Sequence, residues 1–125
     1  MSAFAELGQL EPLQIWDGVV GRVVGGDQLT LAVVELKANA VIPEHSHENE
    51  QVGVLVAGSL TFRVGEEERE LKPGGAWTIH ANVPHEIRTG PDGAVVIETF
   101  APPRKDWDAL ERLETVPPRW PDSAG

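Results

Sequence analysis

The stretch that decides the fold is residues 43–87, which read PEHSHENEQVGVLVAGSLTFRVGEEERELKPGGAWTIHANVPHEI. Apolar residues in it alternate with polar or small ones, as in Leu60, Phe62 and Val64. Period-two alternation in short runs bounded by glycine and proline turns indicates β-strands. The same rhythm continues on both sides of the stretch. The sequence therefore predicts an all-β domain of about eight strands, arranged as a sandwich or a barrel.

Length and composition limit the class of protein. The chain has 125 residues, of which 41% are hydrophobic and 24% charged, which is typical of one globular domain. We expect a single domain over residues 1–125 with a barrel core over about 15–101. Cysteine is absent, which excludes disulfides and thiolate metal ligands.

Charge and hydropathy limit the partners. The formal net charge is −10, so we expect neither a nucleic-acid partner nor an anionic membrane surface. No apolar run reaches the length of about 18 residues that a membrane helix needs, and the first residues do not resemble a secretory signal. These features lead us to expect a cytoplasmic protein.

The C-terminal region carries one helical pattern. After Pro102-Pro103, apolar residues recur every third position at Trp107, Leu110 and Leu113, which predicts a helix over 106–113 that lies against the barrel. We expect the helix and an irregular, proline-rich tail to occupy about 105–125.

Histidines form the main functional signal. His45 and His47 are two residues apart, so on a strand both imidazoles point to the same side. Gln51 follows after three residues, and His85 comes about forty residues later, on a strand that can lie beside the first. Two solvated imidazoles would explain the pair alone, but three of the four histidines in the chain fall in these two places. We predict that they converge.

These residues resemble the two-motif core of the cupin superfamily. The first cupin motif is matched by His45, His47, Gln51 and Gly58, and the second by Pro73-Gly74, Asn82, Pro84 and His85. The resemblance implies a double-stranded β-helix, or jelly-roll barrel. It also implies one divalent transition-metal ion, zinc, nickel, iron or manganese, with His45, His47, Gln51 and His85 as ligands.

Four residues leave alternatives open. Many cupins have Glu at the position of Gln51, and a neutral amide ligand would leave more of the ion's charge to act as a Lewis acid. Glu50 is a rival oxygen donor, although strand alternation points it to the opposite face. His80 would lie at the mouth of the site or on the surface, and Arg22 at the barrel rim or on the surface.

A second group of residues lies at the end of the barrel, in the sequence ETFAPPRKDW of residues 98–107. Glu98 and Phe100 share one strand face, and Arg104 follows two prolines. By themselves these are common surface residues. Their spacing resembles, with Glu in place of Asp, that of small cupins that open and ketonise 4,5-unsaturated uronates in pectin and alginate breakdown. The resemblance implies catalytic roles for Glu98, Phe100 and Arg104.

The leading hypothesis is a metal-dependent, non-redox lyase or isomerase that acts on a small anionic, sugar-like substrate. Glu98 would move a proton and Arg104 would hold a carboxylate. An iron dioxygenase and a non-catalytic metal- or ligand-binding module remain as alternatives. The apolar run Val52, Val54 and Val56 leads us to expect a homodimer, unless a second sheet of the same chain covers it.

Overall fold

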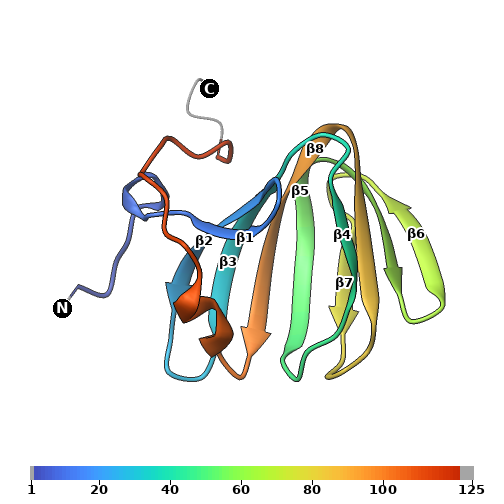
Figure 1. The fold of residues 1–125 in the computed structure, drawn as a ribbon, viewed down its shortest axis with the longest axis horizontal. Coiled ribbons are helices and arrows are strands. Elements are labelled where there is room, and N and C mark those ends of the chain that lie inside the picture. The colour runs from blue at the N-terminus through green and yellow to red at the C-terminus, as the bar shows by residue number, and fades with distance from the viewer. Residues whose placement is uncertain (1, 122–125) are drawn as a thin grey trace.

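The protein was analysed as a computed structural model, which describes residues 2–121. These residues form eight strands and two short 3₁₀-helices (Figure 1). In chain order the elements are η1 (Leu7–Gln9), β1 (Leu13–Trp16), β2 (Val19–Gly25), β3 (Thr30–Leu36), β4 (Val41–His45), β5 (Glu50–Val64), β6 (Glu67–Leu71), β7 (Ala76–Ile79), β8 (His85–Ala101) and η2 (Lys105–Ala109). The prediction of an all-β jelly-roll barrel is confirmed.

Two long strands connect the two layers of the barrel. All strand pairs are antiparallel, in the order β1-β2-β3-β8-β5-β6, with β4 on β8 and β7 on β5. The first half of β5 pairs with the second half of β8, and the second half of β5 pairs with the first half of β8. β5 and β8 therefore pass from one layer to the other, and the side chains on their inner faces meet inside the barrel.

Glycines allow the bends in β5 and β8. Gly58 and Gly93 both have positive φ, 82° and 70°, and a Cβ on Gly58 would lie 2.0 Å from the carbonyl oxygen of Gly93. Only glycine fits such a close approach. β5 continues through Gly58, and the turn to β6 comes after Val64. The segment 90–93 is likewise a bend within β8.

Apolar side chains fill the barrel beside the predicted site. Leu55, Leu60 and Ile79 are almost completely buried, and the rings of Phe62 and Trp77 pack with centroids 4.9 Å apart. Burial of each such side chain contributes about 1.5–3 kcal/mol. The barrel thus has a core of its own. Separately, no helix in residues 2–121 is long and apolar enough to span a membrane.

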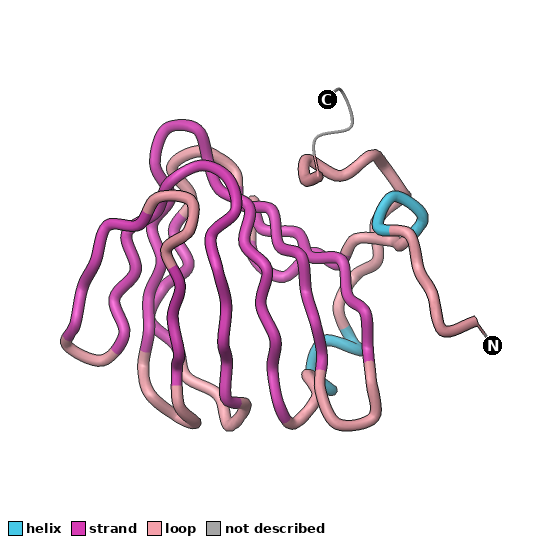
Figure 2. Tube along the Cα trace, turned by 180° about the vertical axis from the view of Figure 1, so that it is seen from behind, coloured by secondary structure: helices cyan, strands magenta, loops and turns pink. Residues whose placement is uncertain are grey.

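The predicted C-terminal helix over 106–113 is shorter than expected. Only Lys105–Ala109 is helical, as a 3₁₀-helix that lies near the ends of the first strands (Figure 2). The chain then becomes extended, and its main chain bonds to the residues at the start of β1: Gln14 N donates to Glu111 O and Leu113 N to Pro12 O. An edge strand has unpaired backbone groups, and this pairing satisfies them where a continued helix would not.

Arg22 lies on the outer face of the sheet and not at the rim of the pocket. Its side chain is 1% exposed, with Nη1 2.6 Å from Glu35 Oε2 and Nη2 donating to Val116 O. The C-terminal segment therefore covers this part of the sheet. A second part of the outer face is less covered, because Val52 is 47% exposed.

Candidate functional site

Three histidines meet at one end of the barrel. His45 ends β4 and His85 begins β8, and the two residues pair across these strands. Their ring centroids are 4.2 Å apart, and those of His47 and His85 are 4.9 Å apart. One ring nitrogen from each of the three lies within 4.8 Å of the others, so the group could hold a metal ion.

Main-chain carbonyls orient all three imidazoles. Nδ1 of His45, His47 and His85 donates to Pro43 O, Asn49 O and Val83 O respectively, each over 2.9 Å. In the neutral form of each ring, Nε2 is then the unprotonated nitrogen that can bind a metal ion. Nε2 of His85 is buried and has no hydrogen-bond partner among residues 2–121. Fixed tautomers, a carbonyl behind each ring and a buried lone pair fit a divalent transition metal.

Gln51 completes the donor set with an oxygen. It is 4% exposed on the inner face of β5, and its Oε1 lies 3.1 Å from Nε2 of His47. The loops are tied together as well, because Asn82 N donates to His47 O. Three imidazole nitrogens and one amide oxygen are suitable ligands for zinc, nickel, iron or manganese.

Burial keeps His47 and His85 in the form that binds metal. The pKa of His85 is lowered to about 4, mainly by desolvation; the bond to Val83 O opposes this shift, and the charges of His45, His47 and Arg104 add to it. Desolvation, followed by the charge of Arg104, also lowers the pKa of His47. Both rings are thus neutral near neutral pH and need no deprotonation before coordination.

Glu98 is a buried carboxyl beside these residues. It is 7% exposed, and its Oε1 accepts a hydrogen bond of 2.6 Å from Nε2 of Gln51. Desolvation raises the pKa of Glu98 to about 7, although the bond from Gln51 and the charge of Arg104 act in the opposite direction. A carboxyl in this range can both donate and accept a proton at neutral pH.

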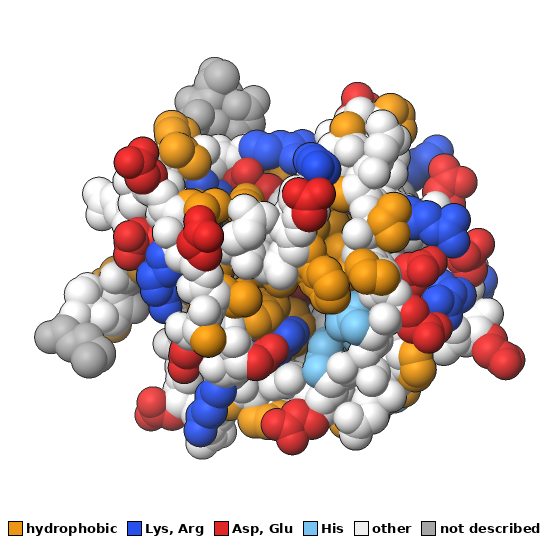
Figure 3. All heavy atoms as spheres, viewed as in Figure 1, with side chains coloured by type: hydrophobic (Ala, Val, Ile, Leu, Met, Phe, Trp, Pro, Cys, Tyr) orange, Lys and Arg blue, Asp and Glu red, His pale blue; other side chains and the backbone are white. Residues whose placement is uncertain are grey.

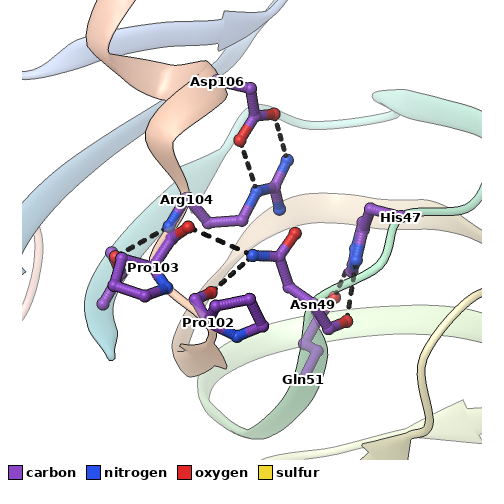
Figure 4. Close-up of polar contacts among 8 residues, drawn as sticks. His47, Asn49, Gln51, Pro102, Pro103, Arg104 and Asp106 are labelled. Carbon is purple, nitrogen blue, oxygen red and sulfur yellow. Dashed lines mark hydrogen bonds and ion pairs between the residues drawn. The ribbon is translucent and has the colours of Figure 1, made fainter. Parts of the chain in front are cut away.

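Arg104 is held between aromatic rings. Its guanidinium carbon lies 4.8 Å from the ring centroid of Phe100 and 4.3 Å from that of Trp107, within the range of cation–π contacts. Its Nε and Nη2 donate to the two carboxylate oxygens of Asp106, over 3.1 and 2.9 Å (Figure 4). Asp106 therefore occupies the edge of the guanidinium formed by Nε and Nη2, and Nη1 lies outside this pair.

These residues line one cavity of about 190 Å³. Its polar part contains the three histidines, Gln51, Glu98, Arg104 and Asp106, and its apolar part contains Ile15, Trp16, Val19, Val34, Ile42, Ile87, Phe100, Trp107 and Leu110. The histidines lie beside a hollow that hydrophobic side chains border (Figure 3). A charged ligand here would meet the guanidinium and the histidines among apolar side chains that displace water.

All residues predicted as metal ligands or catalytic residues line this cavity, whereas Glu50 and His80 do not. Glu50 and His80 are exposed and contact each other, with Nδ1 of His80 2.8 Å from Glu50 Oε2. Asn49, Asp106 and Trp16 were not predicted. Asp106 has a sequence signal, since an acid two residues after Arg104 can pair with it, whereas Asn49 has none.

Comparison with known proteins gives one curated relative. The chain is 29% identical over 96 residues to the pectin degradation protein KdgF of Dickeya dadantii (strain 3937). The aligned part covers 75% of this chain and 87% of that protein.

Solved structures show the same fold. KdgF from Halomonas sp. superposes with a TM-score of 0.77 at 25% identity, over 85% of this chain and 98% of that one. An RmlC-like cupin from Shewanella frigidimarina NCIMB 400 superposes with a TM-score of 0.78 at 24% identity, over 85% and 96%. The family described as the cupin domain matches residues 32–100. That match spans most of the barrel and includes every histidine of the site, so this chain belongs to the cupin family.

Proposed function

We propose that the chain is a metal-dependent, non-redox lyase or isomerase that opens and ketonises a small unsaturated uronate. The observation that carries the proposal is the presence, in one cavity, of a metal-binding donor set, a buried carboxyl and a fixed guanidinium. The similarity to the pectin degradation protein KdgF supports the same class of substrate.

The cavity size favours a single sugar unit. Ligand pockets for larger molecules usually measure about 300–1,000 Å³, whereas this one measures about 190 Å³. A monouronate fits this range better than an oligosaccharide.

The reaction is an isomerisation, so no atom is gained or lost. The proton of the anomeric hydroxyl leaves, the bond from C1 to the ring oxygen breaks to give an aldehyde, and the enol formed at C5 becomes a ketone when C4 takes up a proton. A divalent ion held by His45, His47, Gln51 and His85 would supply Lewis-acid polarisation of a substrate oxygen.

The chain's own residues supply the remaining steps. Glu98 moves the proton, because its pKa near 7 suits both removal and delivery. Arg104 binds the uronate carboxylate with Nη1, since Asp106 occupies its Nε edge. Phe100 transfers no proton. It contacts the guanidinium of Arg104 and lies edge-on to His47, so it keeps water away from these two groups.

The experiment follows the ultraviolet absorbance of the substrate. The ring C=C is conjugated to the carboxylate and absorbs, and ketonisation removes this conjugation. Metal-loaded protein should accelerate the loss of absorbance for galacturonate- or mannuronate-derived substrates. Decay at the spontaneous rate on both would reject the proposal. Oxygen consumption by the iron form would then favour a dioxygenase, and its absence a binding module.

A further inference from the structure

Asn49 is a buried polar residue in the loop between two candidate ligands. It is 5% exposed and lies between His47 and Gln51 in the chain. Its side-chain Nδ2 donates to Pro102 O over 2.5 Å and to Pro103 O over 3.3 Å. Its main-chain oxygen accepts the bond from Nδ1 of His47. One residue thus contacts both the histidine group and the turn that leads to Arg104 (Figure 4).

The turn before Arg104 depends on such contacts. β8 ends at Ala101, and the next two residues are prolines, which have no N–H to continue the ladder. Asn49 bonds the two proline carbonyls from one side. On the other side, Arg104 N donates to Oγ1 of Thr30 over 3.0 Å. The backbone of this arm, residues 102–104, is therefore fixed by two buried side chains.

We propose that Asn49 is a positioning residue that sets the separation between the metal-binding group and the guanidinium of Arg104. Its main chain orients His47, and its side chain holds the arm. A ligand that binds a metal ion through one oxygen and Arg104 through a carboxylate must match this separation. Asn49 thereby selects anions by the distance between their two binding groups.

The primary test uses NMR and needs no turnover. Nε–H of Arg104 is bonded to Asp106, so it should give a resolved, slowly exchanging signal. In Asn49→Ala, and in the isosteric Asn49→Asp, which lacks the amide donor, this signal should shift and lose its slow exchange. Leu60→Val, which alters a core residue outside the cavity, is the control and should leave the signal in place at a comparable loss of melting temperature.

A zinc titration separates positioning of the arm from loss of the metal site. Removing a partner of a metal-binding histidine costs about 10–100-fold in metal affinity. The partner of His47 is the main chain of Asn49, so zinc affinity in Asn49→Ala should stay within about tenfold of the parent. If the uronate reaction is also observed, KM should rise much more than kcat falls, because the anchor is misplaced in ground and transition states alike.

Several results would overturn the proposal. One is an unchanged Arg104 signal in both Asn49 variants, and another is the same change in Leu60→Val. If neither Asn49 variant folds, the parent protein still provides a test, because both side-chain amide protons of Asn49 should exchange slowly. Rapid exchange of these protons would contradict the proposed bonds. None of these readouts depends on the uronate activity, so the two proposals can fail separately.

Discussion

The side-chain amide of Gln51 donates a hydrogen bond of 2.6 Å from Nε2 to Oε1 of Glu98. A carboxylate accepts and the NH₂ group donates, so this bond fixes the amide orientation and turns the oxygen of Gln51 toward His47. A ligand carboxylate at position 51 would instead repel Glu98. The neutral amide of Gln51 can therefore donate to the neighbouring carboxyl of Glu98 without charge repulsion, and each side chain fixes the orientation of the other.

Glu98→Gln should reduce turnover without removing the metal. Glutamine keeps the size of the side chain and can still accept the bond from Gln51, but it cannot transfer a proton. We expect kcat to fall by about 10²–10⁴-fold and bound metal per chain to remain unchanged by elemental analysis. Full activity in this variant would assign the proton transfer to another group.

Replacing His45 and His47 together by alanine should abolish stoichiometric metal. Two of the three imidazoles are then lost, and Gln51 and His85 alone make a weak site. The barrel has its own buried core, so circular dichroism should still show β-structure after chelation of the parent protein. Chelation should lower the melting temperature only through lost ligand binding. Retention of metal in the double variant would refute the ligand assignment.

The stability of the metal-free protein should show two opposing pH effects. The pKa of Glu98 is raised to about 7, so between pH 4.5 and 7 the folded state binds more protons, and stability falls as pH rises. The pKa of His85 is lowered to about 4, so between pH 4 and 6.5 the unfolded state binds more protons, and stability rises with pH. The lowered pKa of His47 acts in the same direction as that of His85.

The Glu98→Gln variant should show the pH dependence of stability that the histidines cause, without the contribution of Glu98. The difference in unfolding free energy, variant minus parent, should increase with pH between 4.5 and 7 by up to about 1.4 kcal/mol per pH unit. Other carboxylates titrate in both proteins and cancel in the difference. Thermal and urea unfolding with a chelator present measure it. A difference that does not change with pH would show that Glu98 is not a perturbed acid.

The sequence predicts features that depend on alternation and spacing. Gln51 on β5 and the pair Glu98 and Phe100 on β8 face the interior because residues two apart share a strand face. His47 lies in the loop after the end of β4, so the loop and not strand alternation places its ring in the cavity. The sequence does not predict contacts made over long separations with no periodic signal. Asn49 contacts Pro102, 53 residues away, and buried Arg22 donates to the main-chain oxygen of Val116, 94 residues away.

The predicted helix over 106–113 does not continue beyond Ala109, for a related reason. Local periodicity predicted it, and the first turn formed with Trp107 buried. The main chain of residues 111–113 bonded to the start of β1 instead, because tertiary pairing outweighs a weak local helical preference.

The homodimer remains a prediction. Val52 is 47% exposed on the outer sheet face, and Val54 and Val56 are half-buried beside it. Burial of this strip against a second copy would remove apolar surface from water. Sedimentation velocity should give a dimer for the parent protein and a larger monomer fraction for Val52→Asp. A parent protein that stays monomeric at all workable concentrations contradicts the prediction.

The Asp106–Arg104 pair leads to the last prediction, which concerns anion affinity. Asp106 places a negative charge on the guanidinium that we propose binds the substrate carboxylate. Two carboxylates about 6 Å apart on one guanidinium repel each other by about 1 kcal/mol in a partly solvated site. Asp106→Asn removes this repulsion and keeps an oxygen that can accept from Nε or Nη2. Its dissociation constant for saturated galacturonate, measured by calorimetry on metal-loaded protein, should therefore decrease about fivefold.

Arg104→Ala should have the opposite effect and a larger one. It removes charge-assisted hydrogen bonds worth about 1.5–3 kcal/mol, so KM should rise about 10- to 100-fold. Arg104→Lys keeps the charge but loses the planar group between Phe100 and Trp107. Its KM should therefore lie between those of the parent and Arg104→Ala. Tighter binding in Asp106→Asn together with weaker binding in Arg104→Ala identifies Arg104 as the anion site. If Asp106→Asn binds the anion more weakly than the parent, Asp106 acts mainly to hold Arg104 in place, and the repulsion argument is wrong.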